Sequence, residues 1–231
     1  MPRRYWYIII IYLVTQLSGI VGAPILLAFG MGQTDAIAVW SIISFTIATV
    51  WMLLLLKPEL EEKSDRSKSG VIILWGIAGF FLALFAQNIA GMIEMYLFNS
   101  SPESENTEML TNIASQSPIF ILLPVIFAPI TEEIIFRKII FGSIYKRTNF
   151  LLAVFISSLA FAAFHFDFTH LLVYFAAGSV FAFLYVRTKS IITPMITHMI
   201  LNSLVMVVQL YREDLENYME QMETILLGGF F

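Results

Sequence analysis

The sequence predicts an all-α protein, a polytopic bundle of about seven helices that cross a membrane. Of its 231 residues, 58% are hydrophobic and only 13% are charged, whereas soluble domains have roughly 45–50% apolar and about 25% charged residues. The apolar residues form runs of about 20, the length that a spanning helix needs. Lys and Arg residues also cluster in every second connection between these runs, as they do in polytopic membrane proteins.

Seven apolar runs are candidates for spanning helices. In chain order they cover residues 5–29, 36–56, 70–98, 117–145, 149–166, 168–187 and 190–211. Two arginines precede the first run, which could therefore be a secretory signal peptide. We expect an uncleaved span instead, because the run continues to about Phe29 without a clear cleavage site. The third and fourth runs are long enough to tilt or to protrude from the bilayer.

The basic residues predict an orientation. The connections on one side of the bundle carry Arg3, Arg4, Lys57, Lys63, Arg66, Lys68, Lys146, Arg147, Arg187 and Lys189. The alternate connections carry none, and Arg212 is the lone basic residue after the last run. Because cytoplasmic loops are enriched in Lys and Arg, we expect the N-terminus inside the cell and the C-terminus outside.

We expect a single membrane-embedded domain over residues 1–231. Residues 1–116 hold the N-terminal spans, and residues 117–210 hold most of the polar residues discussed below. Residues 211–231 form an amphipathic tail that would dock on the bundle or lie at the membrane interface. The net charge is −4 and the basic residues are scattered, so a nucleic-acid partner is not expected. The absence of cysteine excludes disulfides, Cys-ligated metals and a thiol nucleophile.

Ionisable side chains inside the spans mark a candidate site, because each costs about 2.5–3.5 kcal/mol to insert. The ionisable residues that we expect to lie deep in the spans are Glu94, Glu132, Glu133, Arg137, His165 and His198. Two uncharged polar residues, Asn88 and Asn202, also lie within the spans. Glu133 and Arg137 are four residues apart and can pair on one helix face. Glu132 lies about 100° around the helix, without an obvious local partner. A structural salt bridge plus a snorkelling glutamate is the alternative, but Glu132 is about 21 Å from each end of its span.

Four of these groups, from three spans, lie at similar depths. Counted from the cytoplasmic side, Glu132 lies at about 21 Å, His165 at about 24 Å, Asn202 at about 18 Å and His198 at about 12 Å. We therefore expect them to converge on one water-accessible cavity. A carboxylate beside a histidine can activate water, and a second histidine with an amide can stabilise an oxyanion, as a peptide hydrolase requires. Glu132, His165 and His198 could instead hold a divalent metal such as zinc, although H-E-x-x-H is absent.

Three motifs add a family resemblance. The segments "EEIIFRKII", "FAAFH" and "HMILN" contain E-E-x-x-x-R, F-x-x-x-H and H-x-x-x-N. In this order and spacing they resemble the signatures of the CAAX-protease and bacteriocin-processing family, helical intramembrane endopeptidases that include type II CAAX prenyl endopeptidases. The resemblance covers about residues 117–210, and one departure is Lys138, where many members have glycine.

The resemblance implies roles for single residues. Glu132 and His165 would activate water, His198 and Asn202 would form the oxyanion site, and Glu133, Arg137 and Phe161 would support them. It implies an endopeptidase in a bacterial plasma membrane that cleaves a peptide or membrane-protein substrate. Its role would be peptide maturation, peptide signalling or bacteriocin self-immunity. Glutamate and metal mechanisms are both described for the family, and we favour the metal-free form, with no cofactor.

Two other functions stay open: a non-proteolytic adaptor or immunity protein that binds a partner, and a small transporter or proton relay. The sequence does not predict an oligomeric state. Glu94, with Gln87 and Asn88, could line the cavity or snorkel near its loop. Asp167 and His170 fall at a short turn, where we expect solvated side chains, so neither is assigned to the site.

Overall fold

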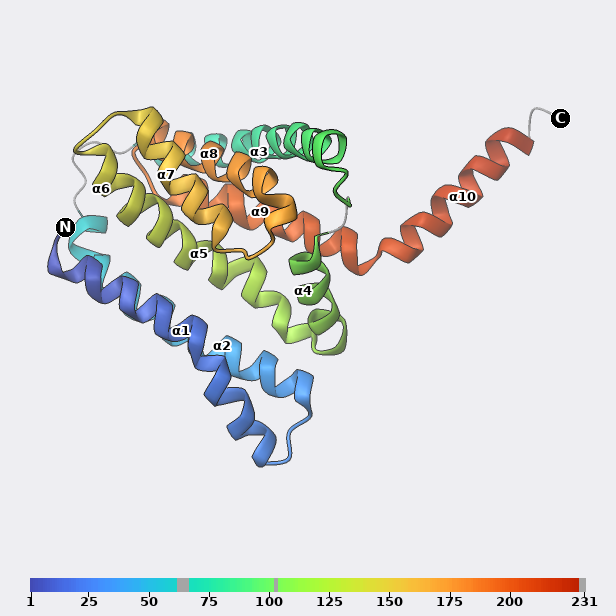
Figure 1. The fold of residues 1–231 in the computed structure, drawn as a ribbon, viewed down its shortest axis with the longest axis horizontal. Coiled ribbons are helices and arrows are strands. Elements are labelled where there is room, and N and C mark those ends of the chain that lie inside the picture. The colour runs from blue at the N-terminus through green and yellow to red at the C-terminus, as the bar shows by residue number, and fades with distance from the viewer. Residues whose placement is uncertain (62–66, 102–103, 229–231) are drawn as a thin grey trace.

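The computed structural model describes residues 1–61, 67–101 and 104–228, which form helices and no strand (Figure 1). The predicted all-α membrane bundle is confirmed. Six helices are apolar and long enough to cross a membrane: Arg3–Ala28, Gln33–Glu59, Ser69–Phe98, Pro118–Tyr145, Phe168–Thr188 and Ile192–Leu210. The predicted fifth span is shorter, because α7 covers only Phe150–Ala163 and ends before His165. Lys63 and Arg66, which contributed to the predicted orientation, lie outside the described residues.

The bundle consists of an N-terminal hairpin and a larger group of helices (Figure 1). The hairpin is α1 (Arg3–Ala28) packed against α2 (Gln33–Glu61). In the larger group, α8 (Leu171–Thr188) packs against α3 (Ser69–Phe98) and α7, and α9 (Ile192–Leu210) also packs against α3. Apolar side chains on the outside remain exposed, for example Ile20 at 73% and Phe85 at 65%, as expected for a surface in contact with lipid.

A short helix, α4 (Glu105–Gln116), precedes the fourth span, which changes its winding along its length. The successive segments are η1 (Pro118–Ile121), η2 (Leu123–Phe127), α5 (Ala128–Glu132), η3 (Glu133–Phe141) and α6 (Gly142–Tyr145). Both η2 and η3 are π-helical, a winding that is rare and frequent at functional sites. In η2 the Ala128 N–H bonds to the Leu123 carbonyl. The next residue, Pro129, has no N–H, so it leaves the Pro124 carbonyl without the corresponding donor.

The core lies around the fourth span, between it and helices α7, α8 and α9, and it extends to buried residues of α1, α2 and α3. Its fully buried side chains include Phe136, Phe161, Phe181, Leu184 and Leu201. The tail forms α10 (Arg212–Gly228), which projects away from the bundle in Figure 1. Among its described side chains, Leu215 and Tyr218 are exposed, so the tail does not dock on the bundle.

Candidate active site

The residues predicted to form the site come from three parts of the fold. Glu132 ends α5, and Glu133 and Arg137 follow within η3. Phe161 lies in α7, and His165 lies in the turn directly after it. His198 and Asn202 lie one turn apart in α9. Because α9 packs against α5 and α7 packs against η3, these residues are brought toward one another.

His198 lies between the two adjacent glutamates. Its Nδ1 is 3.1 Å from Glu133 Oε1, and its Nε2 is 3.8 Å from Glu132 Oε2. Helix geometry gave Glu132 no obvious partner within its own span, and the structure places it beside His198 of the facing helix. The Nδ1 contact has hydrogen-bond length and the Nε2 contact does not.

The contact with Glu133 fixes how neutral His198 can be protonated. A carboxylate oxygen accepts, so Nδ1 carries the proton and donates it. The second nitrogen, Nε2, then faces Glu132 as a lone pair. Together with Arg137, the four groups carry a net charge of about −1 when His198 is neutral and about zero when it gains a proton.

Arg137 is fully buried beneath the glutamates. Its Nε lies 3.2 Å from Glu133 Oε2, as predicted for this pair. Its guanidinium carbon lies 4.3 Å from the centre of the Phe161 ring and 5.1 Å from that of Phe181. The cation is thus held between two aromatic faces, which attract it through their quadrupoles. Phe161 was predicted to support the site, whereas the sequence analysis did not assign Phe181.

His165 is held by backbone and by rings. Its Nδ1 donates to the Phe161 carbonyl at 2.8 Å, because a carbonyl can only accept. In a neutral imidazole this leaves Nε2 as a lone pair that can take a proton. The His165 ring stacks on Tyr174, with ring centres 4.0 Å apart and planes at 26°. The Phe161 ring contacts it edge-on at 4.6 Å.

Asn202 supplies a hydrogen bond that the backbone of the fourth span lacks. Its Nδ2 donates to the Pro124 carbonyl at 2.8 Å, which is the carbonyl that Pro129 leaves without a donor. The amide nitrogen has two N–H groups, so one remains for another acceptor. This contact ties α9 to the fourth span at the level of the site.

A cavity of about 620 Å³ joins three of the four predicted catalytic residues. Glu132, His165 and Asn202 line it, with Gln16, Asn106 and Tyr174 as further polar groups. The rest of the wall is mostly apolar, including Leu13, Leu110, Leu123 and Val205. Glu132 keeps 13% of its side chain accessible, whereas His198 keeps 4% and lies behind it, between the two glutamates. Glu132, His165 and Asn202 therefore meet at one cavity, as predicted. His198 does not line this cavity but contacts Glu132, which does.

The described residues contain no group of three or more His, Asp or Glu side chains placed to share one metal ion. Each histidine uses Nδ1 in a hydrogen bond, to a carbonyl in His165 and to a carboxylate in His198. Only the two Nε2 atoms and Glu132 would remain for an ion, and in this arrangement they do not form a three-ligand set.

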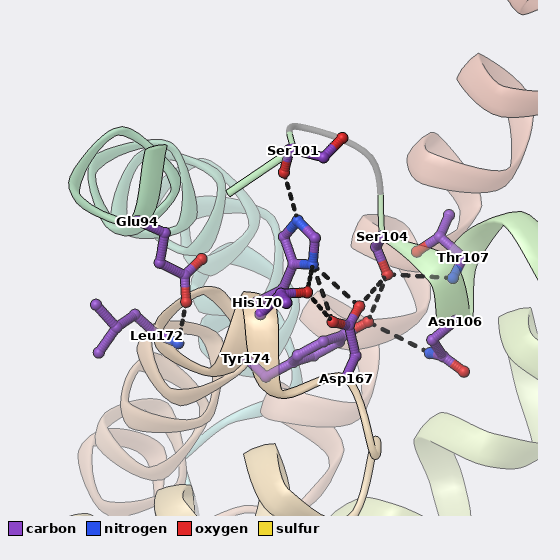
Figure 2. Close-up of polar contacts among 10 residues, drawn as sticks. Glu94, Ser101, Ser104, Asn106, Thr107, Asp167, His170, Leu172 and Tyr174 are labelled. Carbon is purple, nitrogen blue, oxygen red and sulfur yellow. Dashed lines mark hydrogen bonds and ion pairs between the residues drawn. The ribbon is translucent and has the colours of Figure 1, made fainter. Parts of the chain in front are cut away.

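A second polar cluster lies beside the site (Figure 2). Asp167 accepts hydrogen bonds from Ser104 Oγ at 2.7 Å and from Thr169 Oγ1 at 2.8 Å. His170 Nδ1 lies 3.0 Å from Asp167 Oδ1, and its Nε2 donates to the Ser101 carbonyl at 2.8 Å. The expectation of solvated side chains at this turn is wrong, because Asp167 and His170 are both buried. We call Ser104, Asp167, Thr169 and His170 the turn cluster.

The turn cluster reaches the site through Tyr174. The Tyr174 hydroxyl lies 3.2 Å from Ser104 Oγ and accepts from Asn106 Nδ2 at 3.3 Å, while its ring stacks on His165 (Figure 2). Burial alone would raise the pKa of Asp167, but the bonds from Ser104, His170 and Thr169 outweigh it and hold that pKa below its ordinary value. Sequence reasoning missed Tyr174 and Phe181, although their spacing of seven places both on one face of α8.

Glu94 is a buried cap rather than a snorkelling residue. One of its carboxylate oxygens accepts the Leu172 N–H at the start of α8 (Figure 2), where a negative charge stabilises a helix N-terminus. Glu94, Gln87 and Asn88 line a second cavity of about 450 Å³. This cavity shares Tyr174 and Asn202 with the active-site cavity, but Glu94, Gln87 and Asn88 do not line the active-site cavity itself.

Comparisons with known proteins agree with this arrangement. A family described as "Type II CAAX prenyl endopeptidase Rce1-like" matches residues 114–204, which contain all the predicted site residues. The chain is 44% identical to "Putative membrane peptidase YdiL" of Bacillus subtilis (strain 168), over the full length of both proteins. It is 33% identical to "Membrane-embedded CAAX protease MroQ" of Staphylococcus aureus (strain USA300), over 89% of both. No solved structure matches.

These relatives and the six apolar helices show an integral membrane protein of the bacterial plasma membrane. The full-length match at 44% identity and the match to the membrane-embedded CAAX protease cover the motifs and the spans before them. This chain therefore belongs to the Rce1-like family of type II CAAX prenyl endopeptidases, a family of membrane-embedded peptidases.

Proposed function

We propose that this chain is an intramembrane endopeptidase in which Glu132 and His165 activate the attacking water. One observation carries the proposal: Glu132, His165 and Asn202, from three separate elements, line the same cavity of about 620 Å³. A cavity with apolar walls and a few convergent polar groups is the usual form of an enzyme site.

The first step is attack by water on a peptide carbonyl. Water held between Glu132 and His165 gives a proton to one of them as its oxygen bonds to the carbonyl carbon. Glu132 is ready to accept as a carboxylate, and His165 presents the lone pair of Nε2 because its Nδ1–H is bonded to the Phe161 carbonyl. The carbonyl π electrons move to oxygen and form an oxyanion.

The second step expels the amine. An N–H donor stabilises the oxyanion, and the amide of Asn202 has one N–H left after its bond to Pro124. The oxyanion collapses, the C–N bond breaks, and the proton taken from water passes to the departing nitrogen. The products are one carboxylic acid and one amine, so atoms and charge balance without a cofactor.

His198, Glu133 and Arg137 orient Glu132 in this scheme when His198 carries a proton on both ring nitrogens, because a lone pair on Nε2 does not attract a carboxylate. The chain of contacts runs from Arg137 to Glu133, then to His198 Nδ1, and from His198 Nε2 to Glu132. The buried cation offsets the charge of the two carboxylates. The predicted oxyanion role of His198 stays a prediction, and it requires a proton on Nε2. A metal held by Glu132, His165 and His198 would need these side chains to move, and no step here depends on one.

We further propose that the substrate is a bacterial peptide or membrane protein, in peptide maturation, peptide signalling or bacteriocin self-immunity. The support is the bacterial origin of both relatives and the printed description of one as a membrane-embedded CAAX protease. The specific biological role rests on the resemblance of the three motifs.

Replacing Glu132 tests the proposal. The E132Q variant keeps the shape of the side chain and removes the base. Peptides released from bacterial membranes that contain wild-type protein, E132Q or E213Q are compared by mass spectrometry. The control residue, Glu213, is exposed at the start of α10. Products that depend on the wild-type protein should fall at least about 100-fold in E132Q and stay unchanged in E213Q.

Equal amounts of folded E132Q and wild-type protein, judged by gel filtration, make the comparison valid. Unchanged products from E132Q would overturn the hydrolase proposal. If the biological activity of the protein also survived, the adaptor function would replace it. Adding a chelator to the purified wild-type protein tests the metal question separately, because the scheme above predicts undiminished cleavage.

A further inference from the structure

Lys and Arg residues gather at one end of the bundle, and short contacts show which segments share that end. Glu59, near the end of α2, pairs with Arg4 at 2.7 Å and with Lys138 at 2.9 Å. The Ser67 N–H donates to the Thr188 carbonyl at 3.1 Å. The basic residues at the start of α1 and α3 and near the ends of α2, α6 and α8 define what we call the basic end: Arg3, Arg4, Lys57, Lys68, Lys146, Arg147, Arg187 and Lys189.

The opposite end is acidic. Thr34 Oγ1 donates to Gln116 Oε1 at 2.9 Å, which joins the start of α2 to the end of α4. The bond from Ser104 to Asp167 joins the start of α4 to the turn between α7 and α8. Among the described residues this acidic end contains Asp35, Glu105, Glu108, Asp167, Glu213 and Asp214, and Arg212 is its only Lys or Arg.

The active-site cavity lies in the half of the bundle next to the acidic end. The lining residues farthest from the acidic end, Leu13 and Glu132, lie near the middle of their spans. The others come from the middle of α1 and α2, from α4, from the first part of the fourth span, from the α7–α8 turn and the start of α8, and from the later part of α9. They include Asn106, Thr107, Met109, Leu110, Phe166, Val205 and Met206. None of the lining residues comes from the basic end.

Several lining residues are exposed. Leu13, Leu17 and Val205 lie within spanning helices, where exposed side chains face lipid. Met109 and Phe166 instead lie at the acidic end and mark the mouth of the cavity there. Met109 is 55% exposed and Phe166 is 75% exposed. Phe166 has φ of 55°, a left-handed conformation that is strained for a bulky residue. Such strain persists only where the surrounding structure enforces it, and it clusters at functional sites.

We infer that the substrate polypeptide enters the cavity from the extracytoplasmic side, through the acidic end, and seats an apolar side chain against its wall. The orientation follows from the charges, because cytoplasmic loops are those enriched in Lys and Arg. We expect an apolar substrate side chain because the cavity wall is apolar at Leu110, Leu123 and Val205. Burying apolar surface against this wall stabilises the complex by about 25 cal/mol for each Å². The use of this entrance by a substrate rests on the proposed peptidase function, whereas the orientation does not.

The absence of cysteine makes a direct test possible. Single cysteines are introduced as M109C and F166C at the mouth and as T148C, an exposed position at the basic end. Bacterial cells or spheroplasts that contain each full-length variant are treated with a membrane-impermeant maleimide, before and after permeabilisation. We expect M109C and F166C to react in intact cells and T148C to react only after permeabilisation. The reverse pattern, with T148C labelled from outside, would overturn the inference.

A second measurement tests entry itself. Purified M109C and T148C in proteoliposomes receive a bulky methanethiosulfonate reagent, and cleavage of a peptide that the wild type cleaves is then measured. Modified M109C should lose at least about 10-fold in cleavage and recover when a reductant removes the group, whereas T148C should be unaffected. Equal cleavage by modified and unmodified M109C and F166C would overturn this entrance.

The labelling arm is repeated with E132Q in the background, since accessibility does not require catalysis. In one outcome, M109C and F166C are labelled in intact cells but E132Q does not reduce cleavage. That result would support the orientation and contradict the proposed chemistry. Loss of cleavage in E132Q with T148C labelled from outside would support the chemistry and contradict the orientation. The two failures are therefore distinguishable.

Discussion

Tyr174 links the active-site histidine to the turn cluster. Its ring stacks on His165 with ring centres 4.0 Å apart, and its hydroxyl contacts Ser104 and Asn106. The ring and the hydroxyl therefore have separate tasks. The ring limits how the imidazole can rotate, and the hydroxyl holds the N-terminus of α4 against α8.

Two substitutions of Tyr174 separate these tasks. Y174F keeps the stacked ring, so we expect nearly wild-type kcat and a loss of about 0.5–1.5 kcal/mol in the free energy of unfolding. Y174L removes the ring, so we expect kcat to fall about 10-fold, with a smaller change in KM and a shift in the pH dependence of kcat. Steady-state cleavage measured across pH in proteoliposomes checks both expectations.

The control for this pair is Y218L, because Tyr218 is 61% exposed on α10 and lies outside the bundle. It should leave kcat and the pH profile unchanged. A Y174L variant that folds and keeps the wild-type pH profile would show that Tyr174 does not position His165.

At the level of single residues, the sequence indicated which side chains form the candidate site but did not give all the contacts that each one makes. Glu132, His165 and Asn202 stood out because polar groups are costly in a lipid-embedded helix. The approach of Glu132 to His198 could be expected only from their similar depths, because helix geometry within one span says nothing about the helix facing it. Asp167 and His170 were assigned to solvent because short turns usually are solvated, whereas this turn is covered by α4 and the end of α3.

Glycines in α3 set how closely it approaches α8 and α9. A Cβ built on Gly79 would lie 2.5 Å from Leu184 Cδ1 and 2.6 Å from Thr197 Oγ1. Thr197 also donates to the Gly76 carbonyl at 2.8 Å, and the next residue in α9 is His198. A side chain at position 79 would therefore press on the helix that carries two of the site residues.

We expect G79A to lower the free energy of unfolding by about 1–3 kcal/mol, since overpacking a buried contact forces neighbours to shift. The matched control is G19A in α1, where a Cβ would meet nothing within 4 Å. That variant should be neutral or gain up to about 1 kcal/mol from helix propensity. Thermal unfolding in detergent, followed by tryptophan fluorescence, measures both. Equal melting temperatures for G79A and wild type would contradict the close packing.

The elements themselves were predicted from hydropathy, with one instructive exception. Six of the seven apolar runs are helices of spanning length, because only a helix satisfies its own backbone in lipid. The fifth run, residues 149–166, looked equally apolar but contains only the short helix α7. Hydropathy could not show that the chain turns at Phe164, because the bond from His165 to the Phe161 carbonyl and the left-handed Phe166 that shape this turn leave no trace in an apolar run.

Across the whole molecule, the turn cluster joins three segments of the chain at the acidic end of the bundle. It connects the segment after α3, the start of α4 and the turn before α8 through Ser101, Ser104, Asp167 and His170 (Figure 2). Both partners of the His170 ring are acceptors, which matches an imidazolium with two N–H donors. The cluster thus contains an ion pair within a polar network, and its stability should depend on pH.

The direction of this pH dependence follows from the lowered pKa of Asp167. A carboxyl whose pKa is lower in the folded state stabilises the fold fully above its unfolded pKa of about 3.9, and this stabilisation is lost as the pH falls through the folded value. We therefore expect D167N to cost about 1–3 kcal/mol at pH 7, and the difference between D167N and wild type to shrink below about pH 4.

Melting temperatures of both proteins in detergent, measured from pH 7 to pH 3, provide the test. The comparison reports on Asp167 together with its partner His170, which D167N leaves without the carboxylate of its ion pair, because the remaining titratable groups are present in both proteins. D35N, which changes an exposed carboxylate at the same end, should follow the wild type at every pH. A D167N protein as stable as wild type at pH 7 would show that the turn cluster does not hold the acidic end together. The mouth of the cavity would then need another source of rigidity, because Phe166 and Tyr174 flank this cluster on the sequence and in space.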